Sequence, residues 1–146
     1  MPVAEKIAVI GLGYVGLPLA INLARHFPVT GLDINVARIA ELESGLDTTR
    51  EIERERLAAT SMGFTSEPED VRGFDIYIVT VPTPVDASNQ PDLGAVRSAS
   101  RMVGGVIEPG AIVVYESTVY PGVTEDVAGP ELEAASGLKC GVDFFL

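Results

Sequence analysis

Short apolar runs alternate with helix-like patterns along the whole chain. The β-branched run at residues 6–10 ends at a glycine-rich turn, and apolar residues then recur at helical spacing from Gly16 to Phe27. A second apolar run, residues 28–32, ends at Asp33, and Asn35 can cap the helical pattern that follows it. The amino-terminal part of the chain therefore predicts a strand–helix–strand–helix unit.

The same alternation continues to the end of the chain. Residues 75–81 and 111–115 are typical of buried strands, and an amphipathic pattern that Asp92 can cap lies between them. Pro121 can open another helix, and residues 141–146 predict a last strand.

A weaker pattern separates the two halves. Thr48 and Glu51 have the spacing of a capping box and predict a polar helix to about Ala59, before a short strand around Phe64. Together these elements predict an α/β fold in one domain, residues 1–146, with a doubly wound, mostly parallel sheet of the Rossmann dinucleotide-binding type. In such a sheet, ligands bind at the carboxyl ends of the strands.

Gly11, Gly13 and Gly16 form the pattern G-x-G-x-x-G directly after the first strand. In a dinucleotide-binding turn the first glycine allows the tight bend, the second lets the backbone approach the pyrophosphate, and the third packs the helix against the strand. The helix that starts there directs its positive end at the phosphates. A glycine-rich turn also occurs without a ligand, but its place between strand and helix, with Asp33 ending the second strand, favours a dinucleotide site.

The carboxylate of Asp33 predicts the choice of cofactor. It can accept hydrogen bonds from the adenosine ribose and would repel a 2′-phosphate, so NAD is favoured over NADP. Arg38 follows about one helical turn later, and three interpretations of it stay open: pairing with Asp33, a place beside the ribose, or a solvated position on the helix surface.

Two further strand ends carry candidate contacts. Val81, Pro82 and Thr83 belong to a loop that its prolines make stiff, which suits Thr83 for holding a ligand. Ser117 and Thr118 place two hydroxyls after the next strand, where they either contact the cofactor or only cap the following helix. Both groups are expected at the same edge of the sheet as the glycine turn.

The composition narrows the range of partners. The chain carries 10 Lys and Arg against 21 Asp and Glu, a formal net charge of −11, which disfavours nucleic acid and anionic membrane surfaces. Its apolar runs are too short for a membrane span, and its first residues lack the pattern of a signal peptide. The single cysteine, Cys140, agrees with a reducing compartment, and we expect a cytoplasmic protein.

Neither Cys140 nor His26 predicts a reactive site. Cys140 begins an apolar run and is expected to pack as a small hydrophobic residue. His26, the only histidine, lies at the carboxyl end of the first helical pattern, where a positive charge suits the helix dipole. The sequence shows no metal-binding motif, so no metal is expected.

Three blocks in this order resemble the UDP-glucose/GDP-mannose dehydrogenase family of nucleotide-sugar 6-dehydrogenases. They are residues 6–18 around the glycine turn, Val81-Pro82-Thr83-Pro84 with residues 91–93, and residues 115–124. The resemblance implies an NAD-dependent enzyme that oxidises C6 of a UDP-sugar from alcohol to carboxylate with two NAD⁺, through a thioester on a cysteine. Tyr120-Pro121-Gly122 and residues 136–139 look most like the bacterial branch that acts on UDP-N-acetylhexosamines for surface polysaccharides.

The resemblance also assigns positions within this chain. Those that fall on cofactor contacts are Gly11, Tyr14, Val15, Asp33, Arg38, Thr83 and Thr118. Thr118 also falls on a position that helps to orient the catalytic water. By the same resemblance, the nucleophilic cysteine and the active-site lysine and asparagine would lie beyond Leu146, in a full-length protein that forms a homodimer. We therefore expect this chain alone to bind NAD without oxidising a UDP-sugar.

Two other functions stay open at this point. One is a stand-alone NAD-binding or NAD-sensing module. The other is a dehydrogenase of the β-hydroxyacid type, which opens with a similar glycine turn, although the proline loop and the Glu116-Ser117-Thr118 block argue against it.

Overall fold

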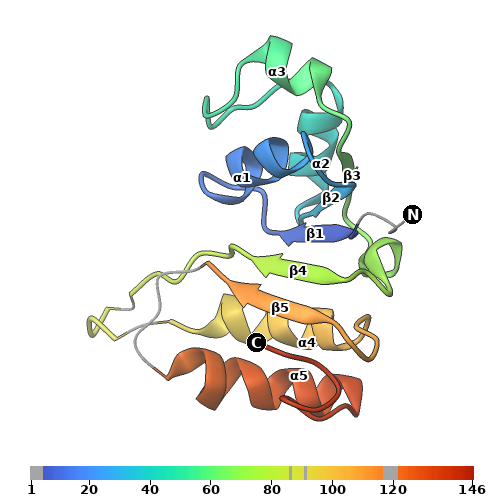
Figure 1. Cartoon of the computed structure of the whole chain (residues 1–146). Helices are drawn as coiled ribbons and strands as arrows, with labels where there is room; N and C mark the ends of the chain where they lie inside the picture. The colour runs from blue at the N-terminus through green and yellow to red at the C-terminus, as the bar shows by residue number, and fades with distance from the viewer. Residues whose placement is uncertain (1–4, 86, 91, 117–121) are drawn as a thin grey trace.

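Five parallel strands form one sheet in the computed structural model, which describes residues 5–85, 87–90, 92–116 and 122–146 (Figure 1). In chain order the strands are β1 (Ile7–Ile10), β2 (Val29–Leu32), β3 (Gly63–Thr65), β4 (Ile76–Val79) and β5 (Ile112–Tyr115). Their spatial order is β3-β2-β1-β4-β5, and every neighbouring pair is parallel. The direction of winding therefore reverses between β1 and β4. This confirms the predicted α/β fold with a doubly wound parallel sheet.

Helices cover both faces of the sheet, as Figure 1 shows. On one side lie α1 (Gly16–Leu23), α2 (Val36–Glu43) and α3 (Arg54–Ala59), and on the other α4 (Gly94–Gly104) and α5 (Gly129–Ser136). Two short turns, η1 (Pro68–Val71) and η2 (Thr124–Ala128), precede β4 and α5. Ile7 and Val9 of β1 belong to the core on the side of α1, α2 and α3, whereas Ala8 and Ile10 belong to the core on the side of α4 and α5. Because both sets are buried, every position of β1 is apolar.

The last segment of the chain differs from its prediction. Residues 141–146 are not a strand, because this described segment has only the single bridges Ile112–Phe145 and Cys140–Phe144. Phe145 donates its N–H to the Ala111 carbonyl (2.9 Å) and accepts the Val113 N–H (2.8 Å). The segment thus lies beside β5 without extending the sheet by a full ladder.

The helix predicted from Thr48 begins only at Arg54, and the expected capping box is absent from this described segment. Thr48 instead donates its N–H and its hydroxyl to Glu41 Oε1 (2.7 and 2.8 Å). The Glu51 N–H is taken by Asp47 Oδ2 (3.0 Å). Two carboxylates that precede the predicted cap, those of Glu41 and Asp47, therefore take the donors of the capping box.

The other predicted caps have mixed outcomes. Asn35 caps α2 as predicted, since its Oδ1 accepts two backbone N–H groups of the first turn (3.1 and 3.3 Å). Asp92 accepts the Gly94 N–H (2.9 Å), but the residue that directly precedes α4 is Leu93. Pro121, predicted to open a helix, lies outside the described residues.

Tyr77 is a fully buried polar side chain in the middle of β4. Its hydroxyl donates to the Val71 carbonyl (2.6 Å) and accepts the Phe74 N–H (3.1 Å). Burial raises the pKa of Tyr77 to about 12. The hydroxyl thus ties the turn before β4 to the core.

We expect Tyr77→Phe to lower the free energy of unfolding by about 1–3 kcal/mol, because it removes the hydroxyl that bonds both the Val71 carbonyl and the Phe74 N–H and leaves these two groups only their hydrogen bond of 3.4 Å to each other. Urea unfolding measures this change, and Tyr14→Phe, the same substitution at an exposed tyrosine, is the control. Since folding favours the protonated hydroxyl, the Tyr77 contribution is complete below pH 10 and is lost as the pH rises toward 12. Equal stability of the Tyr77→Phe variant and the wild type would contradict this role.

Candidate functional site

The glycine turn after β1 gives each of its three glycines a different task. Gly11 has a φ of +95°, a left-handed conformation that side chains rarely adopt. A Cβ on Gly16 would overlap the carbonyl oxygen of Gly11, so α1 can pack against the turn only without a side chain there. At Gly13 no described atom lies within 4 Å of an added Cβ. The space beside Gly13 is therefore open for a ligand that approaches the backbone.

The carbonyl side of the turn is held by a residue that the sequence analysis misses. Thr80 follows β4, and its hydroxyl lies 2.7 Å from the Gly11 carbonyl oxygen and 3.0 Å from that of Ile10. The Gly11 N–H also donates to the Leu32 carbonyl of the neighbouring strand (2.8 Å). Only the position of Thr80 at a strand end, like that of Asp33, could have indicated this contact.

Asp33 holds the turn from the other side. Its Oδ2 accepts the Leu12 N–H (3.0 Å), and its Oδ1 accepts the Asn35 N–H (2.9 Å). The side chain is half-buried at the end of β2, so it is fixed but still reachable. Each carboxylate oxygen has two or more lone-pair sites, so both retain capacity to accept a further hydrogen bond, as from a ribose hydroxyl.

Arg38 is neither paired with Asp33 nor solvated, which makes two of its three sequence-based interpretations wrong. The residue is buried at 9% exposure, and its Nε donates to the Leu12 carbonyl (2.8 Å). Its Nη1 forms ion pairs with Glu41 (2.6 Å) and Asp47 (3.0 Å). Its Nη2 is buried without a hydrogen-bond partner among the described residues. The guanidinium therefore lies under the glycine turn.

The two carboxylates on Arg38 are themselves well supplied with donors. Burial opposes ionisation of Asp47, but hydrogen bonds from Thr49, Ile52 and Arg38 outweigh it and hold the pKa of Asp47 below its ordinary value. Hydrogen bonds from Thr48, and then the contact with Arg38, lower the pKa of Glu41. Both groups are therefore charged at neutral pH. No sequence motif marks either carboxylate as part of the site.

A cavity of about 430 Å³ opens beside the glycine turn, at the point where the winding of the sheet reverses. Its walls come from Gly11, the end of β2 at Asp33 and Ile34, the loop after β4, and the first turns of α4. Most of these side chains are apolar. A slot of this size and polarity suits a flat, weakly polar ring such as adenine, with the Asp33 carboxylate at its edge.

Of the other sequence-predicted residues that the structure describes, Val81 and Pro82 line this cavity. Tyr14 and Val15 project from the turn with exposures of 67% and 56%. Thr83 is half-buried in the same loop. Ser117 and Thr118 lie outside the described residues.

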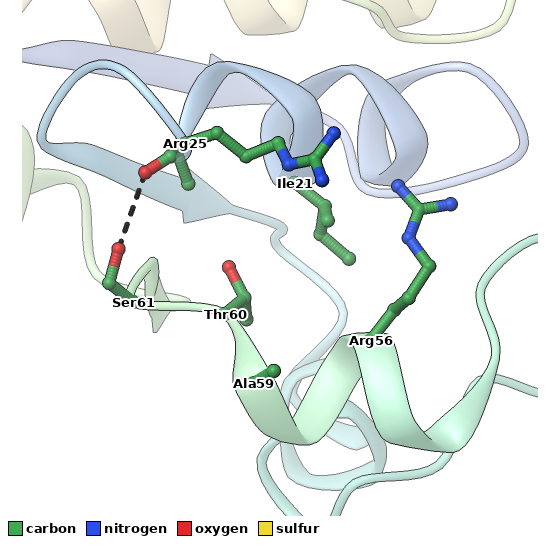
Figure 2. A pocket seen from close by; sticks show the side chains of 7 residues that line it. Ile21, Arg25, Arg56, Ala59, Thr60 and Ser61 are labelled. Atoms are coloured by element: carbon green, nitrogen blue, oxygen red, sulfur yellow. Dashed lines mark hydrogen bonds between the residues drawn. The ribbon is translucent and has the colours of Figure 1, made fainter.

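A second cavity, of about 370 Å³, lies at the opposite end of α1 (Figure 2). Ile21 of that helix and Ala24, which directly follows it, face Arg56, Ala59 and Thr60 of the α3 region across the cavity. Figure 2 shows a hydrogen bond that closes one side, from the Ser61 hydroxyl to the Ala24 carbonyl (3.4 Å). None of the predicted cofactor contacts that the structure describes lines this cavity. The cavity by the glycine turn is therefore the candidate site.

Cys140 is half-buried against the core formed with α4 and α5. Burial, and then the nearby Glu133, raise the pKa of the Cys140 thiol, which opposes formation of a nucleophilic thiolate. Among the described residues, no group of three or more His, Cys, Asp or Glu is arranged to hold a metal ion. Within the same part of the chain, no helix is both long and apolar enough to cross a membrane.

The chain is similar in sequence to known proteins. The chain is 51% identical over 142 residues to Protein CapL from Staphylococcus aureus, and 50% identical over 141 residues to a UDP-N-acetyl-D-glucosamine 6-dehydrogenase from Pseudomonas aeruginosa. These alignments cover 97% and 96% of this chain but 34% and 33% of the relatives. The chain thus spans about a third of the length of the curated relatives it matches.

A solved structure is similar over the same region. The UDP-D-ManNAc dehydrogenase from Pyrococcus horikoshii superimposes with a TM-score of 0.87 at 40% identity, covering 96% of this chain and 34% of that one. The family model for the UDP-glucose/GDP-mannose dehydrogenase family, NAD binding domain, matches residues 5–146. This match decides between that family and the β-hydroxyacid type. The chain belongs to the UDP-glucose/GDP-mannose dehydrogenase family and comprises its NAD binding domain.

Proposed function

We propose that this chain is the NAD-binding part of a nucleotide-sugar 6-dehydrogenase that oxidises the C6 alcohol of a UDP-N-acetylhexosamine to the carboxylate, for the synthesis of surface polysaccharide. The observation that carries the proposal is the cavity between the glycine turn and α4, with the Asp33 carboxylate at its edge. The UDP-N-acetyl-D-glucosamine 6-dehydrogenase among the relatives supports the class of substrate.

The geometry fits NAD. The open space at Gly13 and the start of α1 receive the pyrophosphate, because a helix amino terminus attracts negative charge. Asp33 accepts the adenosine ribose hydroxyls, and Val81 with Pro82 covers the adenine. When bound, NAD⁺ supplies the hydride acceptor for both oxidation steps. The residues of this chain bind and orient it.

The remaining contacts belong to the same proposal. Tyr14 and Val15 flank the pyrophosphate from the exposed side of the turn. Arg38 supports the ribose contact from beneath the turn, because its Nε holds the carbonyl of Leu12, the residue whose N–H binds Asp33. We also propose that Thr83, Ser117 and Thr118 contact the cofactor. Thr118 also positions the water that hydrolyses the thioester.

The complete reaction needs groups that these described elements do not supply. Oxidation of an alcohol to an acid requires a base for the hydride step and a nucleophile that traps the aldehyde. The raised pKa of the Cys140 thiol disfavours it as that nucleophile. We propose that the nucleophile, the base and a second wall for the UDP-sugar come from a following domain of a homodimeric protein.

Gly13→Ala and Gly16→Ala distinguish a glycine that leaves room for a ligand from one that allows close packing of the backbone. Gly13→Ala should weaken NAD⁺ binding at least about tenfold while leaving stability unchanged, because the added methyl meets no described protein atom. Gly16→Ala should instead cost about 1–3 kcal/mol of unfolding free energy, since its methyl meets the Gly11 carbonyl. Calorimetric titration and urea unfolding measure the two effects. Unchanged NAD⁺ affinity in a folded Gly13→Ala variant would argue against a pyrophosphate at this turn.

NAD⁺ should bind at least about tenfold more tightly than NADP⁺, because the Asp33 carboxylate repels a 2′-phosphate and loses its ribose partner. The preference should shrink as salt rises from about 0.05 to 0.5 M, since salt screens a repulsion at this half-buried site. Titration of the wild-type chain with both dinucleotides measures this. Equal affinities at low salt would refute the assignment of Asp33.

The 146-residue chain should bind NAD⁺ yet produce no NADH above background with UDP-glucose, UDP-N-acetylglucosamine or UDP-N-acetylgalactosamine. Absorbance of NADH at saturating NAD⁺ provides the measurement. Turnover that Cys140→Ser abolishes would show that the chain contains its own nucleophile.

A further inference from the structure

The backbone of one residue in the glycine turn, Leu12, is held by side chains at both its N–H and its carbonyl. The Leu12 N–H donates to Asp33 Oδ2 (3.0 Å), and the Leu12 carbonyl accepts from Arg38 Nε (2.8 Å). Leu12 is fully buried, so little water can replace either partner of its backbone N–H and carbonyl. The orientation of the turn therefore depends on how firmly Arg38 is held.

Asp47 is the group that holds the Arg38 side chain in place. The side chain of Asp47 has no exposed surface, and its two oxygens receive five hydrogen bonds of 2.6–3.0 Å. One comes from Arg38 Nη1 and the other four come from Thr49, Glu51 and Ile52. The segment between α2 and α3 is thus folded around this carboxylate, and it presents the carboxylate to Arg38.

The same network neutralises Arg38. Its Nη1 is shared between Asp47 and Glu41, so two negative charges face one guanidinium. Rossmann enzymes that use NADP employ an arginine near the end of the second strand to bind the 2′-phosphate. Arg38 follows that strand end and is linked to Asp33 through Leu12, yet its charge is engaged and its side chain is buried. It is therefore withheld from a phosphate.

We propose that Asp47 is a positioning and specificity-determining residue of the dinucleotide site, which fixes Arg38 on the Leu12 carbonyl and thereby favours NAD over NADP. The inference rests on the proposed NAD-binding function. Asp47 does not contact the cofactor in this arrangement and acts through Arg38. It lies in a segment whose sequence pattern predicts only a peripheral helix.

The test compares the dissociation constants of NAD⁺ and NADP⁺ for Asp47→Asn and the wild-type chain. We expect the constant for NAD⁺ to rise about three- to tenfold, as for other coupled contact networks, and the NADP⁺ to NAD⁺ ratio to fall by at least about threefold. A change that only loosened the fold would raise both constants together and leave the ratio unchanged. In an Arg38→Met background, Asp47→Asn should no longer alter the ratio.

Two further variants complete the design. Glu69→Gln is the matched control, because Glu69 and Arg72 form an exposed pair with the same spacing as Arg38 and Glu41; it should change neither constant. Should Asp47→Asn fail to fold, Glu41→Gln decides. All three hydrogen bonds that Glu41 receives from Arg38 and Thr48 end on one oxygen, which an amide retains, so this variant removes charge alone. It should lower the ratio by at least about twofold.

An unchanged ratio in folded Asp47→Asn, or in Glu41→Gln if that variant must decide, would overturn the inference. Wild-type chain that binds no NAD⁺ would overturn the proposed function itself. The two failures are therefore distinguishable in the same titrations.

Discussion

The site depends on the backbone of one buried residue, Leu12, whose N–H is held by Asp33 and whose carbonyl is held by Arg38. The turn has a left-handed residue at Gly11 and is not rigid by itself, because glycine leaves the backbone free to adopt other conformations. The hydrogen bonds of Thr80 on the preceding carbonyls add a third restraint. Because the turn is fixed before any ligand arrives, little ordering entropy is lost when a dinucleotide binds.

The topology of the sheet puts that turn beside a cavity. β1 lies between β2 and β4, and the chain leaves β1 on one face and β4 on the other. The loops after these strands therefore diverge, and α4 closes the space between them with small residues such as Ala95 and Ala99. The apolar slot and the polar end of β2 meet there, so one site can hold a ring and a ribose together.

Charge is used locally in this acidic domain. With a net charge of −11, the chain offers no general attraction to an anionic dinucleotide. Arg38, the cation beneath the turn, is neutralised by Glu41 and Asp47. Attraction for the pyrophosphate then falls to backbone N–H groups and the dipole of α1, which carry no side-chain charge that a 2′-phosphate could also use.

The sequence by itself determined the features that depend on neighbouring residues. Apolar periodicity defined β1, α1 and β2, the glycine spacing defined the turn, and Asn35 capped α2 as expected, because each of these is set within a few residues of the chain. The alternation of strands and helices predicted the doubly wound parallel sheet that the structure shows. Asp33 also has the place its strand end predicted.

Only the tertiary structure decided what surrounds those elements. Arg38 reaches Leu12 across 26 residues, and Thr80 reaches Gly11 across 69, so no local pattern marks either contact. The capping-box spacing at Thr48 was overridden because the partly buried Glu41 and the buried Asp47 offered charged acceptors to the same donors. The final residues carry a strand-like pattern but form only single bridges. Phe144 is buried and Phe145 pairs beside β5 without a longer ladder of hydrogen bonds. Contacts between distant segments decided these features, and sequence spacing alone does not encode them.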